Sequence, residues 1–200
     1  MNRRALVLAL AAMLGGMSFS PLMAGSVDPA KVPEIKQSDL KLYVTAAEAF
    51  EMKKGNAKIL LIDVRTPEEL QYVGNVGEMM DVNVPYVLND ISGYDEKMKH
   101  YKNAANSDFV TSVNDLVAKK GLDKDSEIIL MCRSGDRSSK GASLLGKAGY
   151  TKVYSVVDGF EGDKAKDGEN KGKRTVNGWK NANLPWDYKM DKDKMYYILN

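Results

Sequence analysis

Short apolar runs with polar or charged residues at their ends recur along the chain, and amphipathic segments separate them. A continuous apolar run of four to seven residues is typical of a strand that is buried on both faces. The predicted strands are residues 58–64, 127–131 and 152–157, with a shorter candidate at 82–84. Since strands alternate with helical segments, the pattern predicts an α/β fold, with a central parallel sheet and helices on both faces.

The predicted helices carry recognisable start and stop signals. Thr45 and Glu48 form a capping box for a helix that ends near Gly55, and Thr66, Pro67 and Glu69 mark the start of the next one. A third helix begins at Ser107 or Asp108 and ends at Gly121, and a fourth spans residues 138–148 before Gly149. In the fourth helix the apolar residues predicted to face the core are Ala142, Leu144, Leu145 and Ala148.

The remaining segments are polar and divide the chain. Residues 25–41 are predicted to be a lead-in arm, 42–187 the folded domain and 188–200 a C-terminal tail whose role is open. Within the domain, no regular structure is predicted for residues 86–106, and the Gly-, Lys- and Asp-rich stretch 162–173 is expected to be an exposed loop. Trp179 and Trp186 are expected to fold back onto the domain.

The first 24 residues have the layout of a secretory signal peptide. Arg3 and Arg4 precede thirteen residues, Ala5 to Met17, that are only Ala, Leu, Val, Met or Gly. We expect cleavage after Ala24, and therefore a periplasmic or secreted protein without a stable membrane anchor. An uncleaved N-terminal anchor is the alternative.

Charge and composition argue against a nucleic-acid-binding function. The chain is 44% hydrophobic and 28% charged, which is usual for a globular domain. Its net charge of +2 comes entirely from Arg3 and Arg4, because the rest contains equal numbers of basic and acidic residues. A nucleic acid is therefore not an expected partner.

Cys132 is the only cysteine, so it cannot form an intramolecular disulfide. It is either an inert core residue or a reactive thiol. It begins the loop Cys132–Arg137 between a predicted strand and a predicted helix, where backbone N–H groups and the helix N-terminus would surround an anion. Arg133 and Arg137 add positive charge, and Gly135 allows the loop to close. This setting favours the thiolate and hence the reactive reading.

Several segments resemble the rhodanese-like domains, which are single-cysteine sulfurtransferases. Leu61–Leu70 is similar to the family's Asp-x-Arg-x-x-x-Glu segment, and Cys132–Arg137 is similar to its active-site loop. Val153–Gly159, followed by Trp179, resembles its closing strand, turn and terminal tryptophan. The resemblance covers roughly residues 40–187 and implies a periplasmic single-domain sulfurtransferase with a rhodanese-like central parallel sheet.

The resemblance also implies a mechanism. Cys132 would attack a small anionic sulfur donor such as thiosulfate, become a persulfide, and pass that sulfur to cyanide, a thiol or a sulfur-accepting protein. The donor-binding candidates are Asp63, Arg65, Arg133, Ser134, Gly135, Asp136 and Arg137. No metal and no cofactor other than the covalent persulfide is expected. Arg137→Ala is predicted to slow sulfur loading much more than it changes stability, and His100 is expected at the surface rather than beside Cys132.

Two alternatives remain open. The domain could be a persulfide carrier that serves one partner protein. A cysteine-dependent phosphatase or arsenate reductase is disfavoured, because those enzymes have five residues between the cysteine and the arginine. Here four residues separate Cys132 from Arg137, and Ser138 occupies the position of their arginine.

Overall fold

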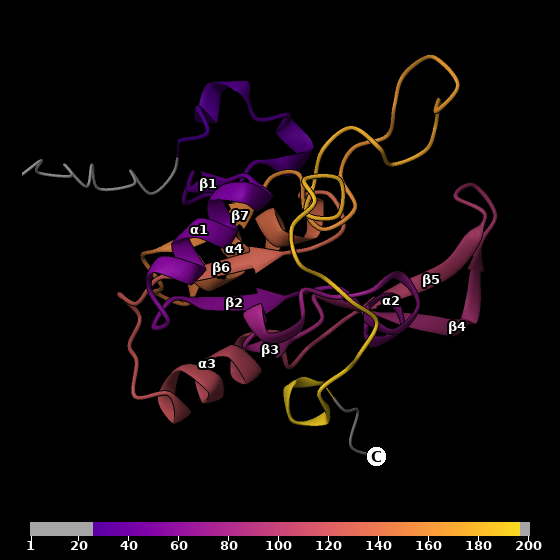
Figure 1. Cartoon of the computed structure of the whole chain (residues 1–200). Helices are drawn as coiled ribbons and strands as arrows, with labels where there is room; N and C mark the ends of the chain where they lie inside the picture. Colours follow the sequence, from indigo (N-terminus) through magenta and orange to yellow (C-terminus); the bar gives the residue numbers. More distant parts are fainter. Residues whose placement is uncertain (1–25, 197–200) are drawn as a thin grey trace, which may run out of the picture.

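A computed structural model describes residues 26–196, and it contains a five-stranded parallel sheet (Figure 1). The strand order is β1-β7-β6-β2-β3. The strands are β1 (Tyr43–Val44), β2 (Leu60–Asp63), β3 (Val82–Asn83), β6 (Ile128–Met131) and β7 (Val153–Val156). The α/β prediction is therefore confirmed, with each predicted strand present and β1 added at the edge.

Helices cover both faces of this sheet, as predicted. They are α1 (Ala46–Gly55), α2 (Pro67–Val73), α3 (Phe109–Lys119) and α4 (Asp136–Lys147). In Figure 1, α1 and α3 lie on opposite sides of the strands. Alternate residues of the strands point to opposite faces, so Leu61 and Ile129 pack on the α1 side while Ile62 and Leu130 pack on the α3 and α4 side. Two apolar cores result, one on each side.

The predicted helix signals are present in the structure. Thr45 with Glu48 and Thr66 with Glu69 both form complete capping boxes at the starts of α1 and α2. Helix α4 begins at Asp136, two residues earlier than predicted. Leu144 was predicted to face the core, and this was wrong. Leu144 is 38% exposed, because the face of α4 that packs on the sheet is the one that carries Ala142 and Leu145.

The segment 86–106, for which no structure was predicted, forms an antiparallel hairpin. Strands β4 (Val87–Asp95) and β5 (His100–Ala105) pair with each other and not with the central sheet. The hairpin extends away from the body of the domain in Figure 1. All of β5 is exposed, including His100, as the sequence predicted for this histidine.

The C-terminal part folds back over the α1 face. Trp179 is completely buried, meets Phe50 edge-on at 5.8 Å between ring centroids, and donates its indole N–H to the Pro185 carbonyl at 2.8 Å. Met190 and Met195 pack against the same core, on either side of the short 3-10 helix η4 (Lys192–Lys194). The chain after β7 thus covers part of the α1 face of the sheet.

The lead-in arm contains the 3-10 helices η1 (Pro29–Lys31) and η2 (Glu34–Lys36), and a third, η3 (Gly77–Met79), precedes β3. None of the helices between residues 26 and 196 is long and apolar enough to cross a bilayer. The predicted signal peptide, residues 1–24, lies outside the described residues.

Candidate functional site

Cys132 lies directly after β6, at the edge where the carboxyl ends of the parallel strands meet. In open α/β sheets this edge is where ligands bind. Cys132 is only 1% exposed, and its backbone carbonyl accepts a hydrogen bond from the Phe160 N–H at 2.8 Å. The thiol is therefore held at the bottom of the loop that connects β6 to α4.

The sulfur has two polar neighbours. The Gly135 N–H donates to Sγ at 3.1 Å, and the Ser138 hydroxyl lies 3.5 Å from it. The Ser138 hydroxyl also donates to the Gly135 carbonyl at 3.1 Å and accepts from the Ser155 hydroxyl at 2.9 Å. These contacts hold the loop around the sulfur, and a backbone N–H aimed at Sγ stabilises negative charge there.

Two glycines allow this close packing. Gly135 has φ +101°, and a Cβ there would lie 2.4 Å from the Val157 carbonyl oxygen. Gly159 has φ +62°, and a Cβ there would lie 2.5 Å from the backbone of Arg133 and Ser134. Both contacts are with backbone that cannot move aside, so only glycine fits at either position. The turn after β7 thus closes directly over the cysteine loop.

The Asp63 and Arg65 segment lies beside this loop. Asp63 pairs with Met131, one residue before Cys132, in the register of β2 and β6. The Arg65 guanidinium forms a two-pronged ion pair with the Asp63 carboxylate, at 2.7 Å for Nη2, and donates to the Gly74 carbonyl at 2.9 Å. It also lies over the Phe160 ring at 4.1 Å. Both charged side chains are fully buried, and their contacts connect β2 to the turn after α2.

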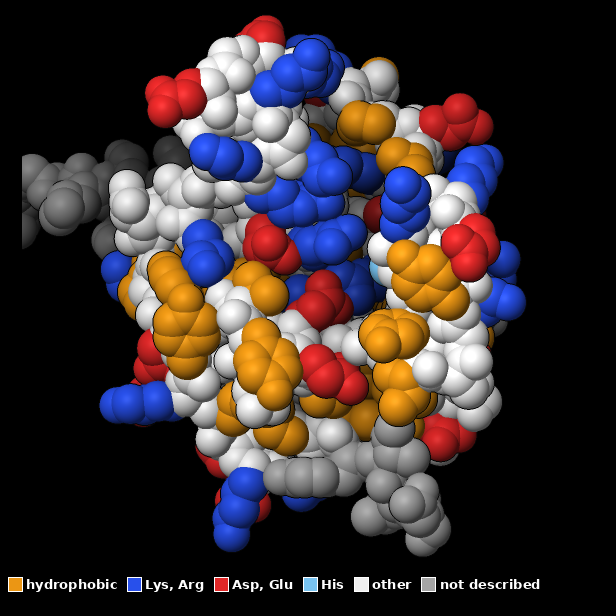
Figure 2. Space-filling view, turned by 90° about the vertical axis from the view of Figure 1, so that its right-hand side faces the viewer, with side chains coloured by type: hydrophobic (Ala, Val, Ile, Leu, Met, Phe, Trp, Pro, Cys, Tyr) orange, Lys and Arg blue, Asp and Glu red, His pale blue; other side chains and the backbone are white. Residues whose placement is uncertain are grey.

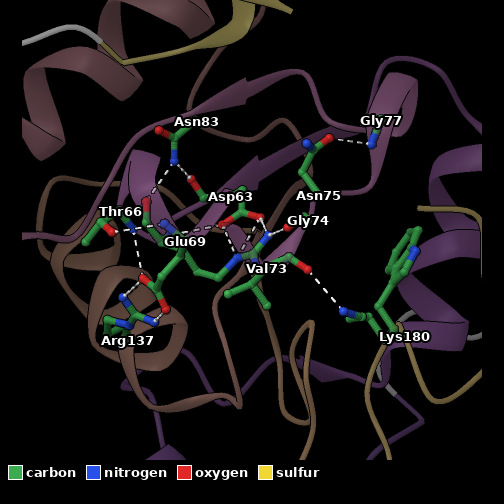
Figure 3. A network of polar contacts seen from close by, with 12 residues as sticks. Asp63, Thr66, Glu69, Val73, Gly74, Asn75, Gly77, Asn83, Arg137 and Lys180 are labelled. Atoms are coloured by element: carbon green, nitrogen blue, oxygen red, sulfur yellow. Dashed lines mark hydrogen bonds and ion pairs between the residues drawn. The ribbon is translucent and has the colours of Figure 1, made fainter. Parts of the chain in front are cut away.

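Asn83 extends the same network. Its amide donates to the carbonyls of Asp63 and Arg65, at 2.9 and 2.8 Å (Figure 3). Two buried atoms of this network, Arg65 Nη1 and Asn83 Oδ1, have no hydrogen-bond partner among the described residues.

Glu69 and Arg137 form the second ion pair near the thiol (Figure 3). Both terminal guanidinium nitrogens donate to the carboxylate, at 2.6 and 2.7 Å. Burial disfavours the Glu69 carboxylate, but the hydrogen bonds and charge of Arg137 outweigh it and hold the pKa of Glu69 below its usual range. Burial likewise opposes the Arg137 charge, yet Glu69 raises the pKa of Arg137, and the Cys132 charge contributes to this rise.

The other predicted donor-binding residues differ in accessibility. The Arg133 side chain is exposed, whereas Ser134 is half-buried with its backbone against Gly159. Asp136 begins α4 and pairs with Lys140, one turn later, at 2.8 Å. No group of three or more His, Cys, Asp or Glu side chains that could hold a metal ion occurs in residues 26–196.

Three site residues were not predicted. Ser138 directly follows the loop in sequence, in the first turn of α4. Ser155 and Glu69 approach the loop only through the fold, since β7 lies beside β6 and α2 follows the neighbouring strand β2. Glu69 was identified as a helix-start residue, which it also is, because its carboxylate accepts from the Thr66 N–H at 3.0 Å. Its four-residue distance from Arg65 in the motif was the only signal of the second role.

Comparison with known proteins supports the resemblance seen in the sequence. Residues 45–166 match the rhodanese-like domain family. An uncharacterised protein from Rickettsia rickettsii is 32% identical over 145 residues, which cover 72% of this chain and 96% of that protein. Thiosulfate sulfurtransferase 18 from Arabidopsis thaliana is 32% identical over 121 residues, covering 58% of this chain and 78% of that protein.

A solved structure is also similar to this chain. The crystal structure of Rv0390 from M. tuberculosis superposes with a TM-score of 0.55 at 29% identity, covering 73% of this chain and 96% of that one. The family match spans more than half of the chain and includes the cysteine loop. This chain therefore belongs to the rhodanese-like domain family.

Proposed function

We propose that the protein is a sulfurtransferase that moves a sulfane sulfur from thiosulfate, or a related donor, to a thiophilic acceptor through a persulfide on Cys132. The observation that carries the proposal is the Gly135 N–H aimed at the Cys132 sulfur at 3.1 Å, in a loop between a strand and a helix N-terminus. Membership of a family with relatives named thiosulfate sulfurtransferases supports the same chemistry.

The reaction has two displacement steps. In the first, the Cys132 thiolate attacks the outer sulfur of thiosulfate, a new S–S bond forms, and sulfite leaves with the electron pair of the old S–S bond. In the second, an acceptor thiolate or cyanide attacks the outer sulfur of the persulfide, and the Cys132 thiolate leaves. Charge and electrons balance without an oxidant, a reductant or a metal ion.

No histidine base is required for this chemistry. The nucleophile reacts as the thiolate, and sulfite leaves as an anion that needs no proton. His100, the single histidine, is exposed on the β4–β5 hairpin, and its ring Nδ1 contacts the Tyr101 carbonyl. Stabilisation of negative charge in the cysteine loop is thus the main contribution of the protein to the first step.

The arrangement of Arg137 weighs against a phosphatase. In that reading an arginine must offer its N–H groups to a phosphate in the cysteine loop. Here both terminal nitrogens of Arg137 are bound to Glu69. Together with the four-residue spacing, this favours sulfur transfer over phosphoryl transfer.

Intact-mass measurement after incubation with thiosulfate tests the proposal. The wild type should gain the mass of one sulfur atom, lose it again on addition of cyanide or a thiol, and show no activity on an aryl phosphate. Cys132→Ser should gain no sulfur. Loading of the serine variant, or no loading of the wild type, would overturn the assignment. Loading without turnover to small acceptors would favour the alternative, a persulfide carrier for one partner protein.

We further propose that the protein acts outside the cytoplasm, after removal of residues 1–24. The support is the signal-like N-terminal sequence, with two arginines before an apolar stretch. Fractionation of cells that express the full chain should yield a periplasmic or secreted product that begins at Gly25. A full-length product in the membrane fraction would indicate an uncleaved anchor instead.

A further inference from the structure

Besides Arg133 and Arg137 within the cysteine loop, a third arginine, Arg174, reaches this loop from the segment that follows β7. Its Nη1 donates to the Gly162 carbonyl. The Gly162 N–H in turn donates to the Arg133 carbonyl at 3.2 Å, and the neighbouring Glu161 N–H donates to the same carbonyl at 3.0 Å. The Arg174 guanidinium is therefore tied, through one residue, to the backbone next to the nucleophile Cys132.

The segment that carries Arg174 is folded rather than loosely attached. Asn177 bonds to both the backbone and the side chain of Asp163, at 2.7 and 3.1 Å. The Asn181 amide donates to the carbonyls of Glu161, Arg174 and Asn177, which lie on both arms of the loop. Arg174 itself is only half-buried. The guanidinium is thus held in place while part of it faces solvent.

Arg174 lies within the electrostatic influence of Arg133 and Cys132. Burial, and then the positive charge of Arg133, hold the pKa of Arg174 below its usual range, whereas Glu161, Asp163 and Cys132 oppose that shift. Two like charges that act on each other in this way lower the stability of the free protein. An anion bound between them would remove that cost.

Both guanidinium groups retain hydrogen-bond donors. Among the described residues, the Arg174 side chain bonds only through Nη1 to Gly162, and the Arg133 side chain forms no hydrogen bond or ion pair. This contrasts with Arg137, whose terminal nitrogens are both used by Glu69. Figure 2 views the face onto which the strand ends open, and it shows Lys and Arg side chains gathered along a hollow at its centre, with Asp and Glu side chains among them.

We propose that Arg174 and Arg133 together form an anion-binding rim above Cys132 that selects doubly charged sulfur donors over singly charged ones. This inference rests on the proposed sulfurtransferase function and adds a donor class and a residue to it. A dianion such as thiosulfate can accept hydrogen bonds from both guanidinium groups while its outer sulfur points to Sγ. A monoanion gains about half of the same electrostatic attraction.

The test compares two donors and four proteins. Sulfur transfer to cyanide is measured with thiosulfate, a dianion, and methanethiosulfonate, a monoanion, for the wild type, Arg174→Ala, Arg174→Lys and Lys166→Ala. Lys166 lies in the same loop and is exposed, so its substitution removes the same charge away from the rim. Arg174→Ala should raise KM for thiosulfate about tenfold, which corresponds to about 1.4 kcal/mol, and KM for methanethiosulfonate about threefold, with kcat nearly unchanged.

The control variants separate local binding from overall charge. Arg174→Lys should recover part of the affinity for thiosulfate, and Lys166→Ala should resemble the wild type with both donors. Equal increases in KM for the two donors, or an equal effect of Lys166→Ala, would overturn the selectivity. A wild-type KM for Arg174→Ala with normal turnover would overturn the inference and leave the sulfurtransferase assignment intact.

A binding readout keeps the two proposals distinguishable if no turnover is found. Thiosulfate should slow the alkylation of Cys132 by iodoacetamide in the wild type, and this protection should weaken in Arg174→Ala. Protection without turnover would support the rim and contradict the proposed function. Absence of both turnover and protection would contradict both.

Discussion

Arg137 lies within the electric field of Cys132, but its guanidinium is already occupied. Both terminal nitrogens bind the Glu69 carboxylate, and the two side chains are only 18% and 21% exposed. The ion pair is close to neutral as a unit, so it attracts a donor much less than a free arginine would. Its geometry suggests that it positions the N-terminus of α4 against α2.

The first prediction concerns Arg137→Ala. Loss of the guanidinium leaves the Glu69 carboxylate largely buried without its partner, so the free energy of unfolding should fall by about 1–3 kcal/mol. Sulfur loading should also slow, because an uncompensated negative charge then repels the anionic donor. Urea unfolding and stopped-flow loading measure the two effects. From the sequence alone, the slowing of sulfur loading was predicted to be much larger than the loss of stability. The ion pair with Glu69 makes the two effects comparable.

A double variant shows through which residue Arg137 acts. Glu69→Gln combined with Arg137→Met removes both charges, so it should recover much of the loading rate that Arg137→Ala loses. If the double variant loads sulfur as slowly as Arg137→Ala, the guanidinium acts on the donor directly.

The second prediction concerns Gly135, whose positive φ and close contact with Val157 leave no room for a side chain. Gly135→Ala should lower the free energy of unfolding by at least about 2 kcal/mol, from backbone strain and steric overlap, and should abolish loading because the N–H moves away from Sγ. Gly168→Ala is the matched control. Gly168 has φ +67° and nothing within 4 Å of an added Cβ, so only the strain of about 1 kcal/mol remains. Equal losses for the two variants would show that the loop tolerates a side chain.

At the scale of elements, the strands of the central sheet were predictable and the hairpin was not. β2 and β6 are buried along their whole length, so their sequences are continuous apolar runs. β4 and β5 bury almost nothing, and their pairing register breaks between Asp90 and Tyr94. Their sequence therefore lacks the alternation by which a half-buried strand is recognised. The Tyr94–Tyr101 ring contact, at 6.3 Å, is one of the few contacts that stabilise the outer part of the hairpin.

The third prediction follows from this lack of burial. An isolated two-stranded hairpin is only marginally stable in water, because it has no apolar face to bury. Backbone amides of residues 91–102 should therefore exchange with deuterium at least a hundredfold faster than those of β2 and β6, as measured by hydrogen exchange with mass spectrometry. The base, where the Asn106 amide donates to the Pro85 carbonyl at 2.8 Å, should exchange more slowly than the tip. Protection of the tip equal to that of β6 would mean that a further contact covers it.

At the scale of the whole molecule, the site is assembled from segments that are distant in sequence. Cys132 and Gly135 could be found in the sequence because one short loop carries both. Arg174 could not, because it follows a stretch rich in Gly, Lys and Asp, and only the fold of residues 162–178 brings it to the loop. Asp63 was expected near the pocket, and its charge does act on Arg137. Burial of Arg65 depends on packing against Phe160, which no local pattern indicates.

The last prediction concerns the acid stability of the folded protein. Because the pKa of Glu69 is lower in the folded state than its ordinary value of 4.5, its ionisation favours folding. This contribution is fully present above the ordinary value and is lost as the pH falls through the lowered folded value. Glu69→Gln should therefore be less stable than the wild type at pH 7 and lose less stability between pH 5 and pH 3. Urea unfolding across this range measures how steeply the free energy of unfolding falls with pH in the wild type and in Glu69→Gln. Glu51→Gln, an exposed change of the same charge on α1, should retain the wild-type slope, and an unchanged slope in Glu69→Gln would contradict the coupling to Arg137.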